Sequence, residues 1–345
     1  MARKKINWAI IGLGAQAEKI AKAIRDSRNG VLTVVADKNI KRAAEFAKNF
    51  NAKAFLNDLG KLLRHPQVDA VFIASPNHMH ASQSISALNA KKHVLCEKPM
   101  ALSLREALAV KKSASKSKIM FGVGFHLRFH PLFKEVKRII RSEKLGKIVF
   151  IDMHWSAGTA GEIKMPILPK HMLWRENIRQ SGGGALMARG IHLFDLIGFI
   201  FGRDADEVRA LSDNYSKNKV DQLTAGVVRI DDILAILVTS RKIPFALNHI
   251  TIYGNRGRLF MPEPFSAEGA GVLETTIMGK KTVEKFTKKH NLYKEEIEDF
   301  ADAILRNKKW SGADINDGLK SVAATEAWRS SLSGVKTKFF RYNIN

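Results

Sequence analysis

Two glycines near the start of the chain, Gly12 and Gly14, separate an apolar run from a helical pattern. In the G-x-G-x-x-A pattern Gly12-Leu13-Gly14-Ala15-Gln16-Ala17, the first glycine permits a tight turn and the second lets a pyrophosphate approach the backbone. The helix that follows would offer its N-terminal N–H groups to the phosphates. The pattern predicts a dinucleotide site made by residues 12–16, and the alternative is a plain turn.

An acidic residue ends the next predicted strand. Asp37 stands 23 residues after Gly14, where a carboxylate can accept hydrogen bonds from the hydroxyls of an adenine ribose. Such a carboxylate favours NAD because it repels the 2′-phosphate of NADP, whereas the neighbouring cations Lys38 and Arg42 favour NADP. We therefore expect NAD as the cofactor, with NADP as the alternative, and we assign Asp37, Lys38 and Arg42 to the cofactor site.

The apolar pattern changes near residue 124. Before it, short apolar runs alternate with amphipathic helical stretches, as in βαβ units; beyond it, apolar residues alternate with polar ones, as in an open antiparallel sheet. We expect an α/β protein with an N-terminal doubly wound Rossmann domain over 1–124 and a C-terminal α+β domain over 125–345. The predicted strands are 8–12, 32–37, 70–74, 93–96, 119–122, 148–155, 207–212, 224–229, 234–239 and 247–253, and the last two predicted helices are 292–306 and 314–333.

The formal net charge of +24 is unusual for a chain of 345 residues. The basic residues are spread over predicted helix surfaces without interleaved aromatic residues, which favours a solvated surface over a nucleic-acid site. No uninterrupted apolar run reaches the 18 or so residues that span a bilayer, so we expect no membrane partner and a cytoplasmic location. Cys96 is the only cysteine, which excludes an internal disulfide.

Several further segments carry a family resemblance. In chain order they are Ala74-Ser75-Pro76-Asn77-His78-Met79-His80, Cys96-Glu97-Lys98-Pro99, Arg128-Phe129-His130-Pro131, Trp174-Arg175, Ser181-Gly182-Gly183-Gly184-Ala185-Leu186, Gly190-Ile191-His192-Leu193-Phe194-Asp195 and Ile252-Tyr253-Gly254. With the glycine turn, they resemble the glucose-fructose oxidoreductase and inositol dehydrogenase (Gfo/Idh/MocA) family. This family consists of NAD(P)-dependent oxidoreductases of sugars and cyclitols, and the likeness covers nearly the whole chain.

The resemblance implies roles for particular residues. It places Lys98 beside the reacting carbon, makes His192 the residue that transfers a proton, and brings Glu97 to the nicotinamide ribose. The other implied contacts are Ser75, Pro76, Asn77 and His80 with the cofactor, and Arg128, Trp174, Arg175 and Arg189 with the substrate. The resemblance also implies a homodimer or homotetramer, formed through the open face of the second sheet.

The chemistry agrees with two of these assignments. Oxidising a secondary alcohol needs a hydride acceptor, a group that takes the hydroxyl proton and a positive charge near the developing alkoxide. Histidine titrates near neutral pH and can transfer the proton in either direction. Lysine supplies a point charge. Lys98 and His192 therefore have the residue types that this reaction requires.

One position departs from the family pattern. The helix of His192 usually carries an aspartate four residues earlier, on the same face, and this chain has Ala188 there, followed by Arg189. Two functions remain open. The chain is either an active dehydrogenase or reductase, whose substrate could carry a carboxylate or phosphate suited to Arg175 and Arg189, or a nucleotide-binding regulator that has lost turnover.

Two histidine pairs invite a metal interpretation, His78 with His80 and His126 with His130. Neither pair has acids or cysteines at ligand spacing, so we expect no metal. The loop 159–172 is expected to shape the substrate pocket, although its sequence does not identify the substrate or the direction of the reaction.

Overall fold

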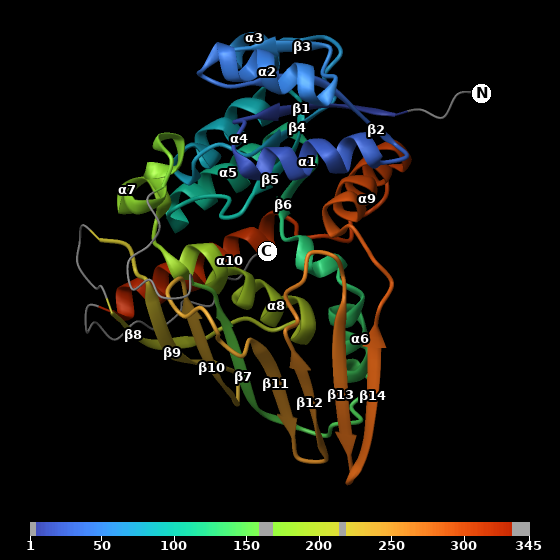
Figure 1. Ribbon diagram of the computed structural model, residues 1–345, viewed down its shortest axis with the longest axis vertical. Coiled ribbons are helices and arrows are strands. Elements are labelled where there is room, and N and C mark those ends of the chain that lie inside the picture. The colour runs from blue at the N-terminus through green and yellow to red at the C-terminus, as the bar shows by residue number, and fades with distance from the viewer. Residues whose placement is uncertain (1–4, 159–167, 214–218, 333–345) are drawn as a thin grey trace. The chain divides into compact units, whose positions relative to one another are not determined.

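The computed structural model describes residues 5–158, 168–213 and 219–332. The chain forms two compact units, one of Met1–His126 with Asn291–Leu319 and the other of Leu127–His290 with Lys320–Asn345. Figure 1 shows the elements of both units with their labels.

The first unit is a doubly wound Rossmann fold, as predicted. Its sheet has the strand order β3-β2-β1-β4-β5-β6, and all neighbouring strands pair in parallel. The order reverses between β1 and β4, which is where open α/β sheets bind ligands. The strands are β1 (Ile6–Ile11), β2 (Gly30–Ala36), β3 (Ala54–Leu56), β4 (Ala70–Ile73), β5 (His93–Glu97) and β6 (Phe121–Gly124).

The helices of this unit begin at side-chain caps that the sequence supplies. The Asn39 side chain accepts hydrogen bonds from the backbone N–H groups of Lys41 and Arg42, and the Ser103 hydroxyl accepts one from Glu106. Such caps satisfy N–H groups that have no partner inside the helix. The helices are α1 (Ala15–Asp26), α2 (Ile40–Phe50), α3 (Leu59–Leu63), α4 (His80–Asn89), α5 (Leu104–Ser117) and α9 (Leu292–Arg306), with a short 3-10 turn η1 (Asn77–Met79) before α4.

The segment 291–319 belongs to the first unit, in contrast to the predicted division at residue 124. Helix α9 packs beside α1, and the Phe300 ring lies between the rings of Trp8 and Trp310, with centroids 5.7 and 5.1 Å away. Trp8 is fully buried. The chain therefore returns to the Rossmann sheet after building the second unit, because α9 covers apolar side chains of that sheet.

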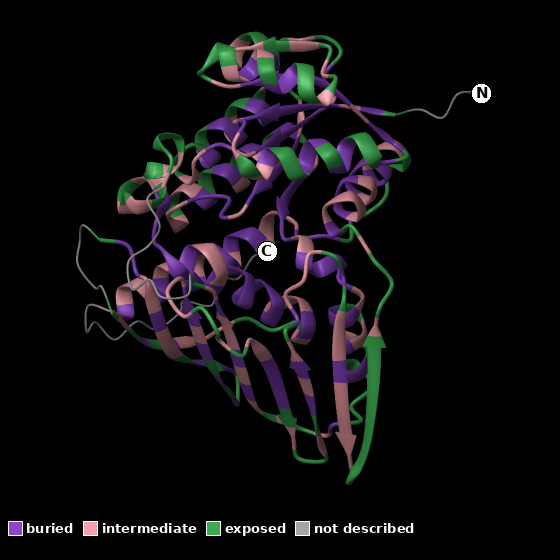
Figure 2. Ribbon diagram, viewed as in Figure 1, coloured by how far each residue is buried: buried purple, intermediate pink, exposed green. Residues whose placement is uncertain are grey.

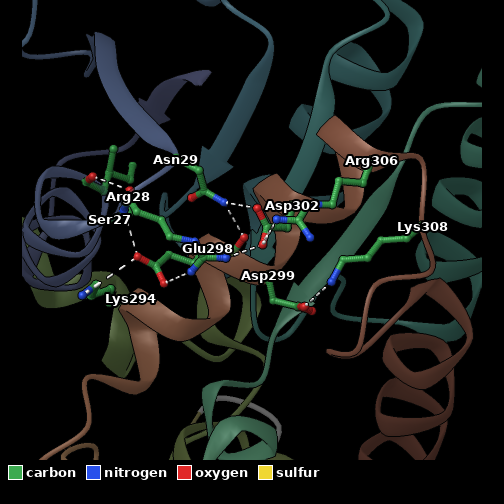
Figure 3. A network of polar contacts seen from close by, with 10 residues as sticks. Ser27, Arg28, Asn29, Lys294, Glu298, Asp299, Asp302, Arg306 and Lys308 are labelled. Atoms are coloured by element: carbon green, nitrogen blue, oxygen red, sulfur yellow. Dashed lines mark hydrogen bonds and ion pairs between the residues drawn. The ribbon is translucent and has the colours of Figure 1, made fainter. Parts of the chain in front are cut away.

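A polar network also ties α9 to the loop before β2 (Figure 3). Arg28 pairs with Glu298 and Asp302, and the Asn29 side-chain amide donates to Asp302 Oδ1 at 2.7 Å and to the Glu298 carbonyl at 2.8 Å. Burial raises the pKa of Asp302, but the hydrogen bond from Asn29 and the charge of Arg28 outweigh it, so the pKa lies below its ordinary value. The network favours the charged carboxylate.

We expect Asp302→Ala to destabilise the protein by about 1–3 kcal/mol at pH 7, because Asn29 loses a buried acceptor. The folded-state pKa is depressed, so this contribution is present above the unfolded pKa and is lost as pH falls through the folded value. Urea unfolding at pH 7 and at pH 3 measures the difference. The exposed Asp26, on α1, is the control; equal costs for Asp26→Ala and Asp302→Ala would contradict the assignment.

The second unit contains a large open sheet whose strand order is β14-β13-β12-β11-β7-β10-β9-β8. All its pairs are antiparallel except β7 with β10, so the predicted mostly antiparallel open sheet is confirmed. The strands are β7 (Ile148–Ser156), β8 (Glu207–Ser212), β9 (Leu223–Ile230), β10 (Ile233–Ser240), β11 (His249–Gly254), β12 (Gly257–Pro262), β13 (Gly271–Ile277) and β14 (Lys280–Phe286).

Helices cover one face of this sheet. The buried Trp328 of α10 (Ile315–Ser331) donates through its indole N–H to Thr224 on β9 and packs edge-on against Phe194 of α8 (Ile191–Phe201). Helix α6 (Pro131–Arg141) packs on α8 and β13. The remaining helical elements are η2 (His126–Phe129), η3 (Lys170–Glu176), α7 (Ile178–Ser181) and the π-helical turn η4 (Leu186–Gly190).

Burial alternates along the strands of the second sheet (Figure 2). On β10, Ile233, Ala235 and Leu237 are buried, whereas Leu234 and Ile236 are exposed. Strand β14 is exposed along nearly its whole length, and it pairs with β13 across a turn in which Met278 and Gly279 have positive φ. The strands β12, β13 and β14 were not predicted from the sequence. Strands β13 and β14 carry few buried apolar residues.

The helical stretch Ile178–Phe201 is long and apolar enough to meet the criteria for a membrane span. Arg179, Arg189 and Asp195 lie within this stretch, and its most apolar part is 72% buried inside the protein. A core helix has the same properties.

Candidate functional site

The glycine turn lies at the point where the strand order reverses. Gly12 has φ +84°, and a Cβ on it would lie 2.5 Å from Ser75 Cα, so the position accepts no side chain. A Cβ on Gly14 would meet nothing within 4 Å, and no side chain caps the start of α1. The open backbone at Gly14 and the uncapped helix start fit the pyrophosphate of a dinucleotide.

Asp37 holds the turn to the end of β2. Its Oδ2 accepts from the Leu13 N–H at 3.1 Å, and its Oδ1 accepts from the Asn39 N–H at 2.9 Å and from Arg42 Nη2 at 2.8 Å. The structure thus brings Asp37 and Arg42 together as a partly buried ion pair. Lys38 is exposed beside them.

The predicted cofactor residues that follow β4 are joined by hydrogen bonds. Ser75 donates through its hydroxyl to Gln83 Oε1 at 2.6 Å. The His80 ring is buried, with Nε2 2.8 Å from the Ser75 carbonyl and Nδ1 2.6 Å from the Pro99 carbonyl. Burial lowers the pKa of His80. His80 therefore holds the loop after β4 to the loop after β5, and Pro76 and Asn77 between these contacts are half-buried.

Glu97 is the last residue of β5, and Lys98 follows it. The Glu97 carboxylate is 9% exposed and accepts from the Lys98 backbone N–H at 3.0 Å, and the Lys98–Pro99 peptide bond is cis. The Lys98 side chain is half-buried. Glu97 and Lys98 thus follow the strand next to β4, so the residues after β1, β2, β4 and β5 all lie at the carboxyl edge of one parallel sheet.

Tyr293 on α9 also reaches this edge, although no motif in the sequence pointed to it. Its phenol hydrogen-bonds with Gln16 on the first turn of α1, and its ring stacks on His126 with centroids 4.5 Å apart. Burial, and then the charge of Glu97, raise the pKa of Tyr293 above its ordinary range. Tyr293 is therefore a neutral hydrogen-bonding group beside two predicted cofactor residues.

In the second unit, the helix that carries His192 is held at its start by Asp221. The Asp221 carboxylate accepts from the backbone N–H groups of Gly184 and Leu186, both at 2.7 Å. A Cβ on Gly184 would lie 1.8 Å from the Asp221 carbonyl oxygen. This contact explains why position 184 of the Ser181–Leu186 motif is a glycine. Asp221 was not predicted from the sequence, because it lies 35 residues from Leu186.

His192 itself lies near aromatic side chains. It is 3% exposed, and its ring centroid lies 5.4 Å from that of Trp155 at the end of β7. Trp155 stacks on Phe265, with centroids 4.1 Å apart and ring planes 7° from parallel. Trp155 and Phe265, neither of which was assigned from the sequence, make an apolar wall beside the predicted proton-transferring residue.

Arg128 forms an ion pair with a carboxylate inside the protein. Its Nη2 donates to Asp195 Oδ1 at 2.7 Å and its Nε donates to both Asp195 oxygens at 3.0 Å; the two residues are 7% and 3% exposed. This buried ion pair attaches α8 to η2. The contact between Arg128 and substrate stays a prediction.

Ala188 and Arg189 belong to the π-helical turn η4 that runs into α8. The Arg189 side chain is half-buried, and burial, followed by the nearby charge of Arg241, lowers the pKa of Arg189 to about 10. Arg241 follows β10 and pairs with Glu176 at 2.6 Å. The guanidinium of Arg189 remains charged at neutral pH.

The remaining substrate residues predicted from the sequence lie on η3. Arg175 is exposed, and its guanidinium lies 5.2 Å from the Trp174 ring centroid. The loop 159–172 was also expected to shape the pocket, and its residues 159–167 lie outside the described part of the chain.

Three histidines of the two pairs considered as metal ligands, His80, His126 and His130, contact other protein groups. His130 caps α6 by accepting from the Leu132 N–H, and burial lowers the pKa of His130 to about 4. Among the described residues, no three His, Cys, Asp or Glu side chains are placed to hold a metal ion. Cys96 is buried, and burial raises the pKa of its thiol.

Known proteins match both units. A family model described as "Oxidoreductase family, NAD-binding Rossmann fold" matches residues 6–125, and one described as "GFO/IDH/MocA C-terminal domain" matches residues 133–260. Glucose-6-phosphate 3-dehydrogenase of Bacillus subtilis is 34% identical over 236 residues, which are 68% of this chain and 63% of that relative. Myo-inositol 2-dehydrogenase of Thermotoga maritima is 28% identical over 73% of each chain.

A solved structure shows the same fold over nearly the whole chain. The aldose-aldose oxidoreductase from Caulobacter crescentus, complexed with glycerol, has a TM-score of 0.85 and is 21% identical. The match covers 97% of this chain and 100% of that one.

We expect Asp221→Ala to destabilise the protein by about 1–3 kcal/mol, because two buried N–H groups at Gly184 and Leu186 lose their acceptor. Thermal or urea unfolding measures this cost. The control is Asp204→Ala, which removes an exposed ion pair with Lys320 and should cost less than about 1 kcal/mol. An Asp221→Ala protein as stable as the control would refute the capping role.

Proposed function

Because the chain belongs to the Gfo/Idh/MocA family of oxidoreductases, we propose that it transfers a hydride between NAD(P) and a carbon of a sugar, sugar derivative or cyclitol. The reacting carbon is a secondary alcohol in one direction and a ketone in the other. Family membership confirms the enzyme class and the NAD(P) cofactor that the sequence predicted.

The observation that carries the proposal is the set of residues at the carboxyl edge of the first sheet. The N–H groups of the Gly12–Gly14 turn and the first turn of α1 would hold the pyrophosphate, Asp37 the adenine ribose and Glu97 the nicotinamide ribose. Ser75, Pro76 and Asn77 would border the same site. When bound, the nicotinamide supplies or accepts the hydride.

Lys98 and His192 would act at the reacting carbon. The Lys98 ammonium would stabilise negative charge on the substrate oxygen, and His192 would take or return the hydroxyl proton. Two buried contacts orient the helix of His192, namely the Asp221 cap and the Arg128–Asp195 ion pair. The stacked rings of Trp155 and Phe265 would exclude water beside His192.

The Asp37–Arg42 pair bears on the choice of cofactor. Asp37 would accept hydrogen bonds from the ribose hydroxyls of NAD. The Arg42 guanidinium lies 2.8 Å from Asp37, and its positive charge would reduce the repulsion between Asp37 and the 2′-phosphate of NADP. We propose NAD as the cofactor, with NADP accepted more weakly.

We expect Asp37→Ser to weaken NADH binding by about 10-fold, because hydrogen bonds to a carboxylate are lost, and to improve NADPH binding relative to NADH because Arg42 is released. Fluorescence titration with both nucleotides measures the ratio of the dissociation constants. Glu45→Ser, which removes an exposed acid from α2, should leave the ratio unchanged. An unchanged ratio for Asp37→Ser would show that Asp37 does not select the cofactor.

We expect Lys98→Ala and His192→Ala each to lower kcat by about 10²–10⁴-fold, the usual contribution of a positioned acid–base group. Nicotinamide absorbance should be followed with a panel of sugars, sugar phosphates, nucleotide sugars and cyclitols. Lys112→Ala, on the exposed side of α5, is the control. NADH binding should persist in all the variants, and full turnover by Lys98→Ala would contradict its role.

The second candidate function is that of a nucleotide-binding regulator, and Ala188 in place of the family's aspartate favours it. In that case NADH binds but no substrate of the panel turns over. Turnover that appears only in Ala188→Asp would show that the lost carboxylate had no substitute. Turnover by the wild type would reject the regulator.

We also propose that the chain forms a homodimer or homotetramer in the cytoplasm. Support comes from the open face of the second sheet, where Val227, Leu234 and Ile236 are exposed. Size-exclusion chromatography with light scattering tests the assembly, and a monomer would contradict it.

A further inference from the structure

Arg189 is a half-buried arginine that forms no ion pair with a carboxylate of the described residues. Three other buried or half-buried arginines have an acidic partner: Arg42 has Asp37, Arg128 has Asp195 and Arg241 has Glu176. A fourth, the half-buried Arg329, donates to the Gly182 carbonyl. Within residues 5–158, 168–213 and 219–332, Arg189 makes no ion pair. A partly buried cation without a counter-charge is destabilising.

The surroundings of Arg189 increase this cost. Burial lowers the pKa of Arg189 to about 10, and the charge of Arg241 lowers it in the same direction. Ala188, its neighbour on η4, contributes no charge. Two guanidinium groups therefore act on one region of the second unit, and one of them is already paired with Glu176. An incoming anion would relieve both the burial and the repulsion.

Arg189 also lies close in the chain and in the fold to the proposed reaction site. It stands three residues before His192, on the turn that leads into α8. The next residue, Gly190, packs near Thr239 on β10, and Thr239 pairs with Trp155 on β7. Arg241 follows the same end of β10. His192, Trp155 and both arginines are thus gathered at the carboxyl ends of β7 and β10.

We propose that the substrate is an anionic sugar or cyclitol whose phosphate or carboxylate binds Arg189, with Arg241 as the second cation. The guanidinium fork matches both anions through two parallel hydrogen bonds. This inference rests on the proposed oxidoreductase function and specifies its substrate class. The neutral polyol part of the substrate would then lie against Trp155, where aromatic rings bind the C–H faces of a sugar ring.

The first test compares matched substrates that differ in one charge. The values of kcat/KM are measured for hexoses against their monophosphates, and for aldoses against the corresponding uronic acids, with NAD(P) in excess. A hydrogen bond to a charged group contributes about 10–100-fold, so the wild type should favour at least one anionic class by that factor. In Arg189→Met this preference should fall toward one, mainly through KM, and in Arg189→Lys it should fall partly.

The control is Arg105→Met, which removes an exposed arginine from α5 of the first unit and should keep the wild-type preference. Without ligand, Arg189→Met should melt at the same temperature as the wild type or higher, because it removes an uncompensated charge. A structural role for Arg189 predicts the opposite shift, so a large loss of stability would overturn the proposal.

The outcomes separate this inference from the function on which it rests. Equal turnover of neutral and anionic substrates, unchanged in Arg189→Met, overturns the inference and leaves the oxidoreductase function standing. If NADH binds but neither class turns over, the proposed function fails, and calorimetric titration with glucose 6-phosphate decides the inference. Binding that weakens at least 10-fold in Arg189→Met supports the anion site, and binding that is absent or unaffected overturns it.

Discussion

The backbone of Gly12 lies so close to the backbone of Ser75 that no side chain fits between them. This approach joins the ends of β1 and β4, where the sheet changes direction. Asp37 attaches the end of β2 to the glycine turn by accepting a hydrogen bond from the Leu13 N–H. His80 attaches the loop after β5 to the loop after β4, because its ring lies between the Ser75 and Pro99 carbonyls. The position of Lys98, next to Pro99, therefore depends on contacts that begin at Gly12, pass through the backbone of Ser75 and continue through the His80 ring.

The apolar pattern predicted the positions of the glycine turn and of the acid after β2, because both follow a strand end, and a strand end can be located from an apolar run. The family resemblance, and not this pattern, pointed to the Glu97-Lys98-Pro99 segment. Tyr293 could not be found in this way, since its partner Gln16 lies in the first helix. Asp221 likewise lies in a loop without a motif. The return of the segment 291–319 to the first unit was also missed, because its contacts are with residues far away in the chain.

Arg128 and Arg189 show why residue type alone does not assign a role. The sequence placed both with the substrate. In the structure, the Arg128 guanidinium is hydrogen-bonded to the carboxylate of Asp195. Removing either partner of such a buried pair is costly, because the charge of the remaining partner is left unpaired inside the protein. Arg128 therefore helps to hold α8 in position, independently of which substrate binds. Arg189 has no such partner among the described residues, and for this reason we propose it, and not Arg128, as the group that binds an anion.

The same distinction applies to the net charge of +24. Cations on helix surfaces are screened by salt within about 10 Å at ionic strengths near 0.1 M, so they act on the rate at which an anion approaches more than on its affinity. A half-buried guanidinium is screened much less. If the substrate is anionic, the surface charge and Arg189 therefore contribute separately, the first to association and the second to selection. Raised salt should weaken the first effect and largely spare the second.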